Sequence, residues 1–292
     1  MTRARTPTGQ SVAPPHAEFF PRPGDDDGPR GWIATLADEA RELRRFWPVV
    51  VNMVGQELRV RYQRSVLGFL WTLVNPILMM TTMTIVFSQI FNERTEGYAI
   101  FLFAGMVPWN FMAGSLTECA SSIISNEGLI RKIYLPKLVF PLTRVLINLT
   151  TFLLSMMALF VILGPLGARP SLPMVMLPVV VAVFFVFTLG LGLLLATVNT
   201  FYRDCAHFIA VFIQAWYFLT PILYPASRFR EAAVRFWLNP AYPFIRMFQT
   251  IICDRQWPDL TTFTVAAGLA TVSLGIGYVA FKLNEDKMVF RL

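Results

Sequence analysis

Residues 170–202, PSLPMVMLPVVVAVFFVFTLGLGLLLATVNTFY, contain no Asp, Glu, Lys or Arg. A helix of about 20 apolar residues spans the hydrocarbon core of a bilayer, so this run is long enough to cross it. Five other charge-free runs have sufficient length: Ser65–Asn92, Gly97–Thr117, Val145–Ala168, Cys205–Ser227 and Leu260–Phe281. The sequence therefore predicts a polytopic membrane protein with six transmembrane helices.

Composition agrees with this reading, and periodicity favours helices over strands. The chain is 55% hydrophobic and 15% charged, whereas soluble domains carry about 25% charged residues. In lipid, backbone polar groups must pair internally, which leaves helix bundles or closed barrels. Barrel strands alternate polar and apolar residues, and neither Ile77–Ile90 nor Val179–Ala196 does so. We expect an all-α helix bundle.

The distribution of basic residues predicts the orientation. If both termini lie on one side of the membrane, that side holds 18 of the 25 Lys and Arg residues, and the other holds 7. The positive-inside rule then places both termini in the cytoplasm. Five of the seven lie between Arg228 and Arg255, within a segment rich in proline and aromatic residues. One or two short re-entrant helices are predicted there, dipping into the outer leaflet between spans five and six.

Several function classes are disfavoured by what the sequence lacks. It has no G-x-x-x-x-G-K-[ST] loop for a nucleotide, and its six runs hold no Asp, Glu, Lys or Arg of the kind that ion-driven transporters use. Two histidines and three cysteines show no metal-ligand spacing and predict free thiols, and no catalytic constellation is present. The net charge of +7 is explained by arginines facing lipid headgroups, without nucleic acid. We expect a transport protein without metal or cofactor, driven by a partner.

The N-terminal region divides into a tail and helices. Residues 1–30 contain six prolines and the acidic run Asp25–Asp27, which predicts a disordered cytoplasmic tail. Residues 31–64 are expected to form amphipathic and gate-like helices, because the apolar residues of Trp32–Trp47 recur at helical spacing. This helix would lie on the inner leaflet or pack on its own bundle. Residues 65–292 form the membrane domain.

Three local patterns stand out within the membrane domain. Ser125 and Asn126 are N-cap candidates for a short cytoplasmic helix that Pro136 ends, and this helix is either a docking element or an ordinary loop. The Leu189-Gly-Leu-Gly sequence predicts a close approach between helices. Arg203 and Asp204 are expected at the inner interface, where they can pair or hold phosphate headgroups.

Residues 61–76, RYQRSVLGFLWTLVNP, resemble the start of the first span in membrane subunits of ABC-2 type exporters. The resemblance favours the branch that moves O-antigen, capsular polysaccharide, teichoic acid and related lipid-linked glycans. It extends over about residues 45–292 and includes four further stretches: Glu127–Pro136, Tyr202–Asp204 with His207, Thr220–Pro225 and Asn239–Pro243.

The resemblance implies a homodimer in the bacterial inner membrane, docked to two copies of a separate ABC ATPase that binds ATP and Mg²⁺. In such exporters a short cytoplasmic helix couples the ATPase to the bundle, here Asn126–Leu135. The contacts that it implies are Glu127, Leu129, Ile130 and Lys132.

The resemblance also implies a basic, gate-like element at the cytoplasmic mouth, formed by Arg59, Arg61, Tyr62 and Arg64. Arginine makes bidentate phosphate contacts, so this element can bind the pyrophosphate of a polyprenyl-linked glycan or anchor lipid headgroups. Sugar rings stack on aromatic side chains, and the candidates for lining the path are Phe87, Phe91, Trp109, Trp216, Tyr217 and Tyr224.

Other functions compete with polysaccharide export. A drug or small-lipid exporter has the same architecture, and a scramblase would move lipids without nucleotide. A membrane-embedded glycosyl or phosphoglycosyl transferase would need acidic clusters at an interface. The acidic clusters of this chain lie in the tail and in the Trp32–Trp47 segment, which disfavours the transferase.

Overall fold

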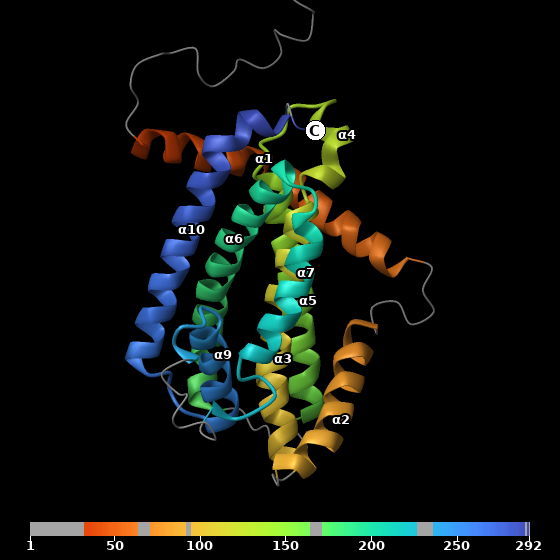
Figure 1. Ribbon diagram of the computed structural model, residues 1–292, viewed down its shortest axis with the longest axis vertical. Helices are drawn as coiled ribbons and strands as arrows, with labels where there is room; N and C mark the ends of the chain where they lie inside the picture. The colour runs from red at the N-terminus through yellow and green to blue at the C-terminus, as the bar shows by residue number, and fades with distance from the viewer. Residues whose placement is uncertain are drawn as a thin grey trace, which may run out of the picture. The chain divides into compact units, whose positions relative to one another are not determined.

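The computed structural model describes residues 32–63, 71–91, 95–163, 171–226, 236–289 and 291 (Figure 1). Within these ranges the regular elements are helices and no strand is found, which confirms the all-α prediction. The predicted tail, residues 1–30, lies outside the described residues. The chain divides after Arg44 into a small N-terminal unit and a large unit that contains the helix bundle.

The first helix, α1, runs from Trp32 to Tyr62 and continues through Pro48. It includes the predicted amphipathic helix Trp32–Trp47 and belongs to both units. In the N-terminal unit, Arg41 pairs with Asp38 one turn away at 2.7 Å. The remainder of α1, from Arg45 onward, belongs to the bundle.

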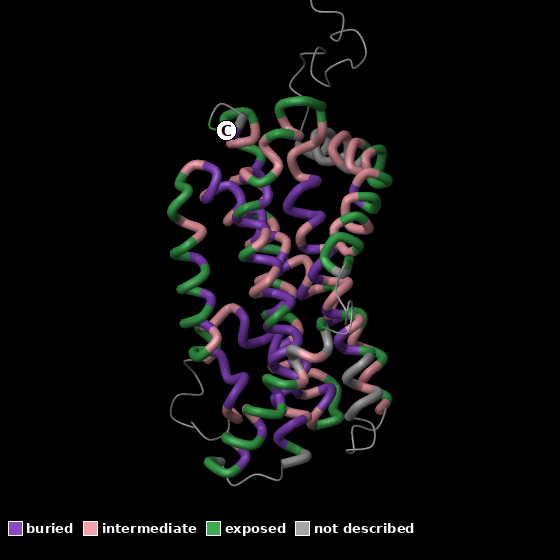
Figure 2. The backbone as a smooth tube through the Cα atoms, turned by 90° about the vertical axis from the view of Figure 1, so that its right-hand side faces the viewer, coloured by how far each residue is buried: buried purple, intermediate pink, exposed green. Residues whose placement is uncertain are grey.

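Four helices are long and apolar enough to cross a membrane, and they correspond to four of the six predicted spans. They are α3 (Thr95–Ser121), α5 (Val139–Leu163), α6 (Leu177–Phe201) and α10 (Leu260–Val289). A 3₁₀ turn, Leu172–Met176, leads into α6. In the most apolar part of α3 72% of the residues are buried, against 22% in α10, so α3 is central and α10 peripheral. Figure 2 shows the buried residues running along the inner helices.

The other two predicted spans form shorter apolar helices. The helix α2 (Trp71–Phe91) represents the first run, whose residues 65–70 lie outside the described part. The helix α7 (Cys205–Leu219) has 15 residues, about 22 Å at 1.5 Å per residue, which is less than the hydrocarbon thickness. It ends because Thr220 precedes Pro221 and takes an extended conformation.

The segment after α7 folds back into the bundle. The helix α9 (Tyr242–Gln249) is followed by a π-helical turn, Thr250–Asp254, and contacts α3, α6 and α10. Phe244 of α9 stacks on Phe187 of α6, with ring centroids 4.5 Å apart. A short helix therefore exists where re-entrant helices are predicted, and residues 227–235 of this segment are outside the described part.

The helices α6 and α10 cross with their backbones in contact. Gly190 of α6 lies against Gly277 of α10, and a methyl group on either glycine would collide with the backbone of the other helix. The Ser273 hydroxyl adds a bond of 2.9 Å to the Phe187 carbonyl oxygen. The close approach predicted from the Leu189-Gly-Leu-Gly sequence is confirmed, because only residues without a side chain fit this crossing.

Candidate functional site

The C-terminal end of α1 is joined to α3 and α5 by two ion pairs. Arg61 contacts Glu118 of α3 at 3.0 Å, and Glu57 contacts Arg144 of α5 at 2.7 Å. Asn148 of α5 donates to the second oxygen of Glu118 at 3.0 Å and so links the two helices. A side chain at Gly114 would press on Asn148, since a Cβ there would lie 2.7 Å from Asn148 Oδ1. This polar network holds the end of α1 against the bundle.

The predicted residues of the cytoplasmic mouth lie at or just beyond this end of α1. Arg59 is exposed on the helix, and Arg61 is a third exposed while paired with Glu118. Tyr62 is the last residue of α1; its side chain, and Arg64 altogether, lie outside the described residues. A guanidinium has five N–H donors, and among the described residues Arg61 uses one nitrogen of this group to bond Glu118 at 3.0 Å.

The predicted coupling helix is shorter than the sequence indicated. A 3₁₀ turn (Ile124–Asn126) leads into α4, which spans only Glu127–Ile130, and turns continue to Ile133. Asn126, one of the two predicted cap residues, does occupy the N-cap position of α4. Its side chain makes no cap bond and donates instead to the Ser122 carbonyl oxygen of the preceding turn, at 2.8 Å. One helical turn has few internal hydrogen bonds, so the packing beneath it decides where it ends.

The loop separates the four predicted contacts into two groups. Leu129 and Ile130 pack on a buried cluster that includes Ile123 and Phe140, so they face the bundle. Glu127 forms an ion pair with Arg131 at 2.7 Å. Lys132 is exposed, as are two residues that the prediction missed, Ile133 (49%) and Tyr134 (57%). Two neighbouring large side chains, Ile133 and Tyr134, are therefore exposed in this loop.

Three of the six predicted aromatic residues meet where α3 contacts α7. Trp109 lies edge-on to Trp216 and to Tyr217, with ring centroids 5.7 Å apart in both cases. The Trp216 Nε1–H donates to Asn239 Oδ1 at 2.7 Å. Trp109 is 3% exposed, so its contribution in this chain is to packing.

The other three predicted aromatics are Tyr224, Phe87 and Phe91. Tyr224 and Trp216 line an apolar cavity of about 690 Å³ beside α6 and α7, and the Tyr224 hydroxyl donates to the Phe218 carbonyl oxygen. Phe87 is partly buried against the core. The side chain of Phe91 lies outside the described residues.

Arg203 and Asp204 stand between α6 and α7, and both are exposed. Among the described residues no ion pair joins them. Asp204 occupies the N-cap position of α7 without a side-chain cap bond. Both side chains thus face outward at this end of the bundle.

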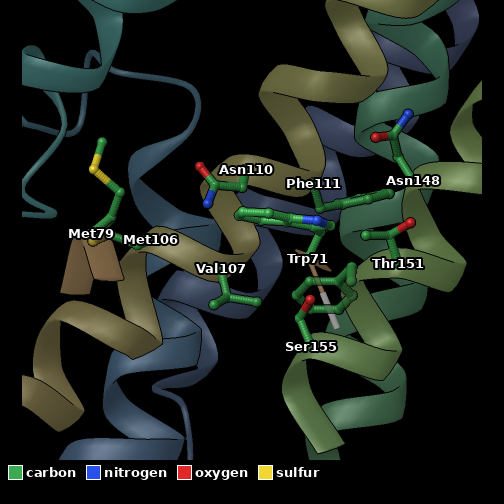
Figure 3. A pocket seen from close by; sticks show the side chains of 10 residues that line it. Trp71, Met79, Met106, Val107, Asn110, Phe111, Asn148, Thr151 and Ser155 are labelled. Carbon is green, nitrogen blue, oxygen red and sulfur yellow. The ribbon is translucent and has the colours of Figure 1, made fainter. Parts of the chain in front are cut away.

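A pocket with a partly polar lining lies between α2, α3 and α5, and sequence reasoning missed it. It has a volume of about 330 Å³ (Figure 3). Its polar lining comes from Asn110 of α3 and from Asn148, Thr151 and Ser155 of α5; its other lining residues are Trp71, Met79, Met106, Val107, Phe111 and Phe152. The signal was the helical spacing of Asn148, Thr151 and Ser155 within a span that lacks charges.

Comparison with known proteins identifies relatives across most of the chain. Residues 49–253 match the family model described as ABC-2 type transporter. The chain is 32% identical over 250 residues to the O-antigen export system permease protein RfbA of Myxococcus xanthus, covering 85% of this chain and 96% of that protein.

Two further relatives point to the same family. The O-antigen export system permease protein RfbA of Klebsiella pneumoniae is 32% identical over 190 residues, 65% of this chain and 73% of the relative. The polysialic acid transport protein KpsM of Escherichia coli is 18% identical over 238 residues, 80% of this chain and 92% of the relative. The chain therefore belongs to the ABC-2 type transporter family of membrane subunits.

Proposed function

We propose that this chain is the transmembrane subunit of an ATP-driven exporter that carries a lipid-linked polysaccharide out of the cytoplasm. The observation that carries the proposal is the 32% identity, over 85% of the chain, to a protein named as an O-antigen export permease. A relative named as a polysialic acid transporter supports polysaccharide cargo in general. ATP and Mg²⁺ are bound by a separate ATPase subunit, and this chain supplies the path.

The functional assembly is a homodimer with two ATPase copies in the bacterial inner membrane. The loop that carries Lys132, Ile133 and Tyr134 docks each ATPase, because its exposed apolar side chains suit a protein partner. The helices α2 and α7 complete six spans, and α9 lies in the outer leaflet. The excess of Lys and Arg on one set of loops favours both termini in the cytoplasm.

The cargo enters at the C-terminal end of α1. Arg59 and Arg61 offer guanidinium groups to the pyrophosphate of a polyprenyl-linked glycan, with Tyr62 and Arg64 beside them in the sequence. The ion pair between Glu57 and Arg144 keeps this end of α1 close to α5. An arriving phosphate competes with Glu118 for Arg61, which couples binding to movement of α1.

Purification with a candidate ABC ATPase subunit from the same bacterium tests the proposal. We expect a stable complex of two membrane and two ATPase subunits whose ATP hydrolysis rises when lipid-linked glycan is added. Hydrolysis that responds to drugs or short lipids and not to glycan would move the assignment to another cargo. Failure to form a complex, together with lipid movement without ATP, would contradict the proposal in favour of a scramblase.

A further inference from the structure

The pocket between α2, α3 and α5 carries polar side chains that lack partners within the described part of the chain. Ser155 lines the pocket and is only 6% exposed, yet no hydrogen bond to its hydroxyl is found among the described residues. Asn110 is exposed near the middle of the Gly97–Ser121 span and likewise has no such bond. Polar groups at this depth are costly unless they face water, protein or a polar ligand.

Four of the polar residues of α5 form one continuous face. Arg144, Asn148, Thr151 and Ser155 follow each other at spacings of four, three and four residues, which places them on one side of the helix. The face begins at the ion pair between Arg144 and Glu57 near the end of α1. It continues into the pocket, where Figure 3 shows Thr151 and Ser155 on α5 across from Asn110 on α3.

The lining selects a neutral ligand rich in hydroxyl groups. Amides and hydroxyls donate and accept hydrogen bonds, and none of the described residues that line the pocket is charged. Thr151 donates to the Ile147 carbonyl oxygen at 3.1 Å, so its oxygen remains available as an acceptor. The half-exposed Trp71 ring supplies an aromatic face inside the pocket (Figure 3). A sugar ring has both complementary surfaces, hydroxyls at its edge and C–H groups on its face.

We propose that this pocket binds uncharged sugar residues of the glycan during transport, with Asn110, Thr151 and Ser155 bonding the hydroxyls and Trp71 stacking on a ring. The inference rests on the proposed function and names the part of the path that recognises sugar. A phosphate is disfavoured because the described lining contains no cation, and an acyl chain because it would leave the polar groups unpaired. The volume of about 330 Å³ is at the lower end of the range for small-molecule sites.

Matched substitutions in adjacent residues test the pocket. Thr151→Val and Ser155→Ala remove lining hydroxyls, whereas Thr150→Val removes a neighbouring hydroxyl that bonds the Leu146 carbonyl oxygen and does not line the pocket. The readout is ATP hydrolysis by the full complex, titrated with lipid-linked glycan extracted from the parent bacterium. We expect each pocket variant to raise the half-maximal glycan concentration about two- to tenfold. The Thr150→Val complex should match wild type.

Cysteine labelling tests access to the same place. Cys119 is fully buried, whereas Cys205 and Cys253 are partly exposed, so a Cys205→Ala, Cys253→Ala background removes both accessible thiols. In this background Thr151→Cys should react with a water-soluble methanethiosulfonate at least tenfold faster than Thr150→Cys. Lipid-linked glycan should slow the reaction of Thr151→Cys, and polyprenyl phosphate without sugar should not.

The outcomes separate this inference from the proposed function. If wild-type hydrolysis ignores glycan, the proposed function fails. If wild type responds and the Thr151 and Ser155 variants respond equally, the pocket inference alone is overturned. Equal protection of Thr151→Cys by polyprenyl phosphate would mean that lipid occupies the pocket. No labelling in the complex without glycan would mean that a second subunit covers it. Either result also overturns the inference.

Discussion

Two regions of the bundle differ in how tightly they are packed. The crossing of α6 and α10 has no free space, whereas the pocket between α2, α3 and α5 leaves polar side chains open. At the crossing, Gly190 and Gly277 bring two backbones into contact and leave no room for a methyl group. At the pocket, the amide of Asn110 and the hydroxyl of Ser155 line a cavity of about 330 Å³. Lipid provides little hydrophobic drive for helix association, so close packing must hold the crossing together.

This difference assigns different tasks to the two regions. The crossing has no room for rearrangement, so it serves as a fixed support for the rest of the bundle. The pocket and the ion pairs of Glu57 and Arg61 contain groups that can exchange partners with water or ligand. We therefore expect substitutions at the crossing to affect folding, and substitutions near α1 and the pocket to affect transport.

The largest effect is expected at the glycine crossing. Gly277→Leu should prevent accumulation of folded protein, because the new side chain would collide with the Gly190 carbonyl group. Overpacking usually costs about 1–3 kcal/mol, and more where backbone must move. The matched control is Gly275→Leu, two residues away, where no atom lies within 4 Å of an added Cβ. Detergent-extracted yield and melting temperature are the measurements, and equal loss in both variants would refute the fixed-support interpretation.

A smaller effect is expected at the cytoplasmic loop. Ile133→Asp should lower affinity for the ATPase subunit at least tenfold, because it places a charge on the exposed apolar surface that we propose for docking. Leu129→Ala should instead lower the melting temperature with little change in affinity, since Leu129 packs on the bundle. Titration of labelled ATPase against purified membrane subunit measures both. The reverse pattern would show that Leu129, as the sequence indicated, makes the contact.

The basic end of α1 should affect transport more than assembly. Arg61→Ala combined with Arg64→Ala should reduce glycan export several-fold while the ATPase still co-purifies, because the change removes phosphate-binding charge. Surface polysaccharide of a deletion strain complemented with each variant is the readout. Normal export by the double variant would rule out a role for these arginines in cargo binding.

The smallest effect concerns a single ion pair. The coupling energy between Glu57 and Arg144, measured from Glu57→Gln, Arg144→Gln and the double variant, should be about 0.2–1 kcal/mol in thermal unfolding. Both side chains are partly exposed, so solvent screens their attraction. A coupling above about 2 kcal/mol would place this end of α1 among the fixed parts of the bundle.

The fold was largely predictable from the sequence, because charge-free length is a physical requirement for crossing a bilayer. The charge-free runs predicted the helices α3, α5, α6 and α10. The glycine at position 190 indicated the close crossing of α6 and α10. The same criterion did not predict that α7 ends at Leu219. Pro221 disfavours a helical conformation at Thr220, so the helix stops although the following residues are apolar.

The candidate site was less predictable, because side-chain direction depends on tertiary packing. A single helical turn does not show whether Leu129 or Ile133 faces the partner, and packing on the cluster around Ile123 decides it. The pairing of Arg61 with Glu118 joins residues far apart in the chain. The spacing of Thr151 and Ser155 was visible, but only their meeting with Asn110 makes a pocket.

Reconstitution with the ATPase tests the central claim most directly. Proteoliposomes should contain the membrane subunit, its ATPase facing outward, and lipid-linked glycan labelled in the outer leaflet. The account predicts that the labelled glycan becomes protected from an added glycosidase only when ATP and Mg²⁺ are present. Protection at the same rate without ATP, or no protection with a complex that hydrolyses ATP, would contradict it.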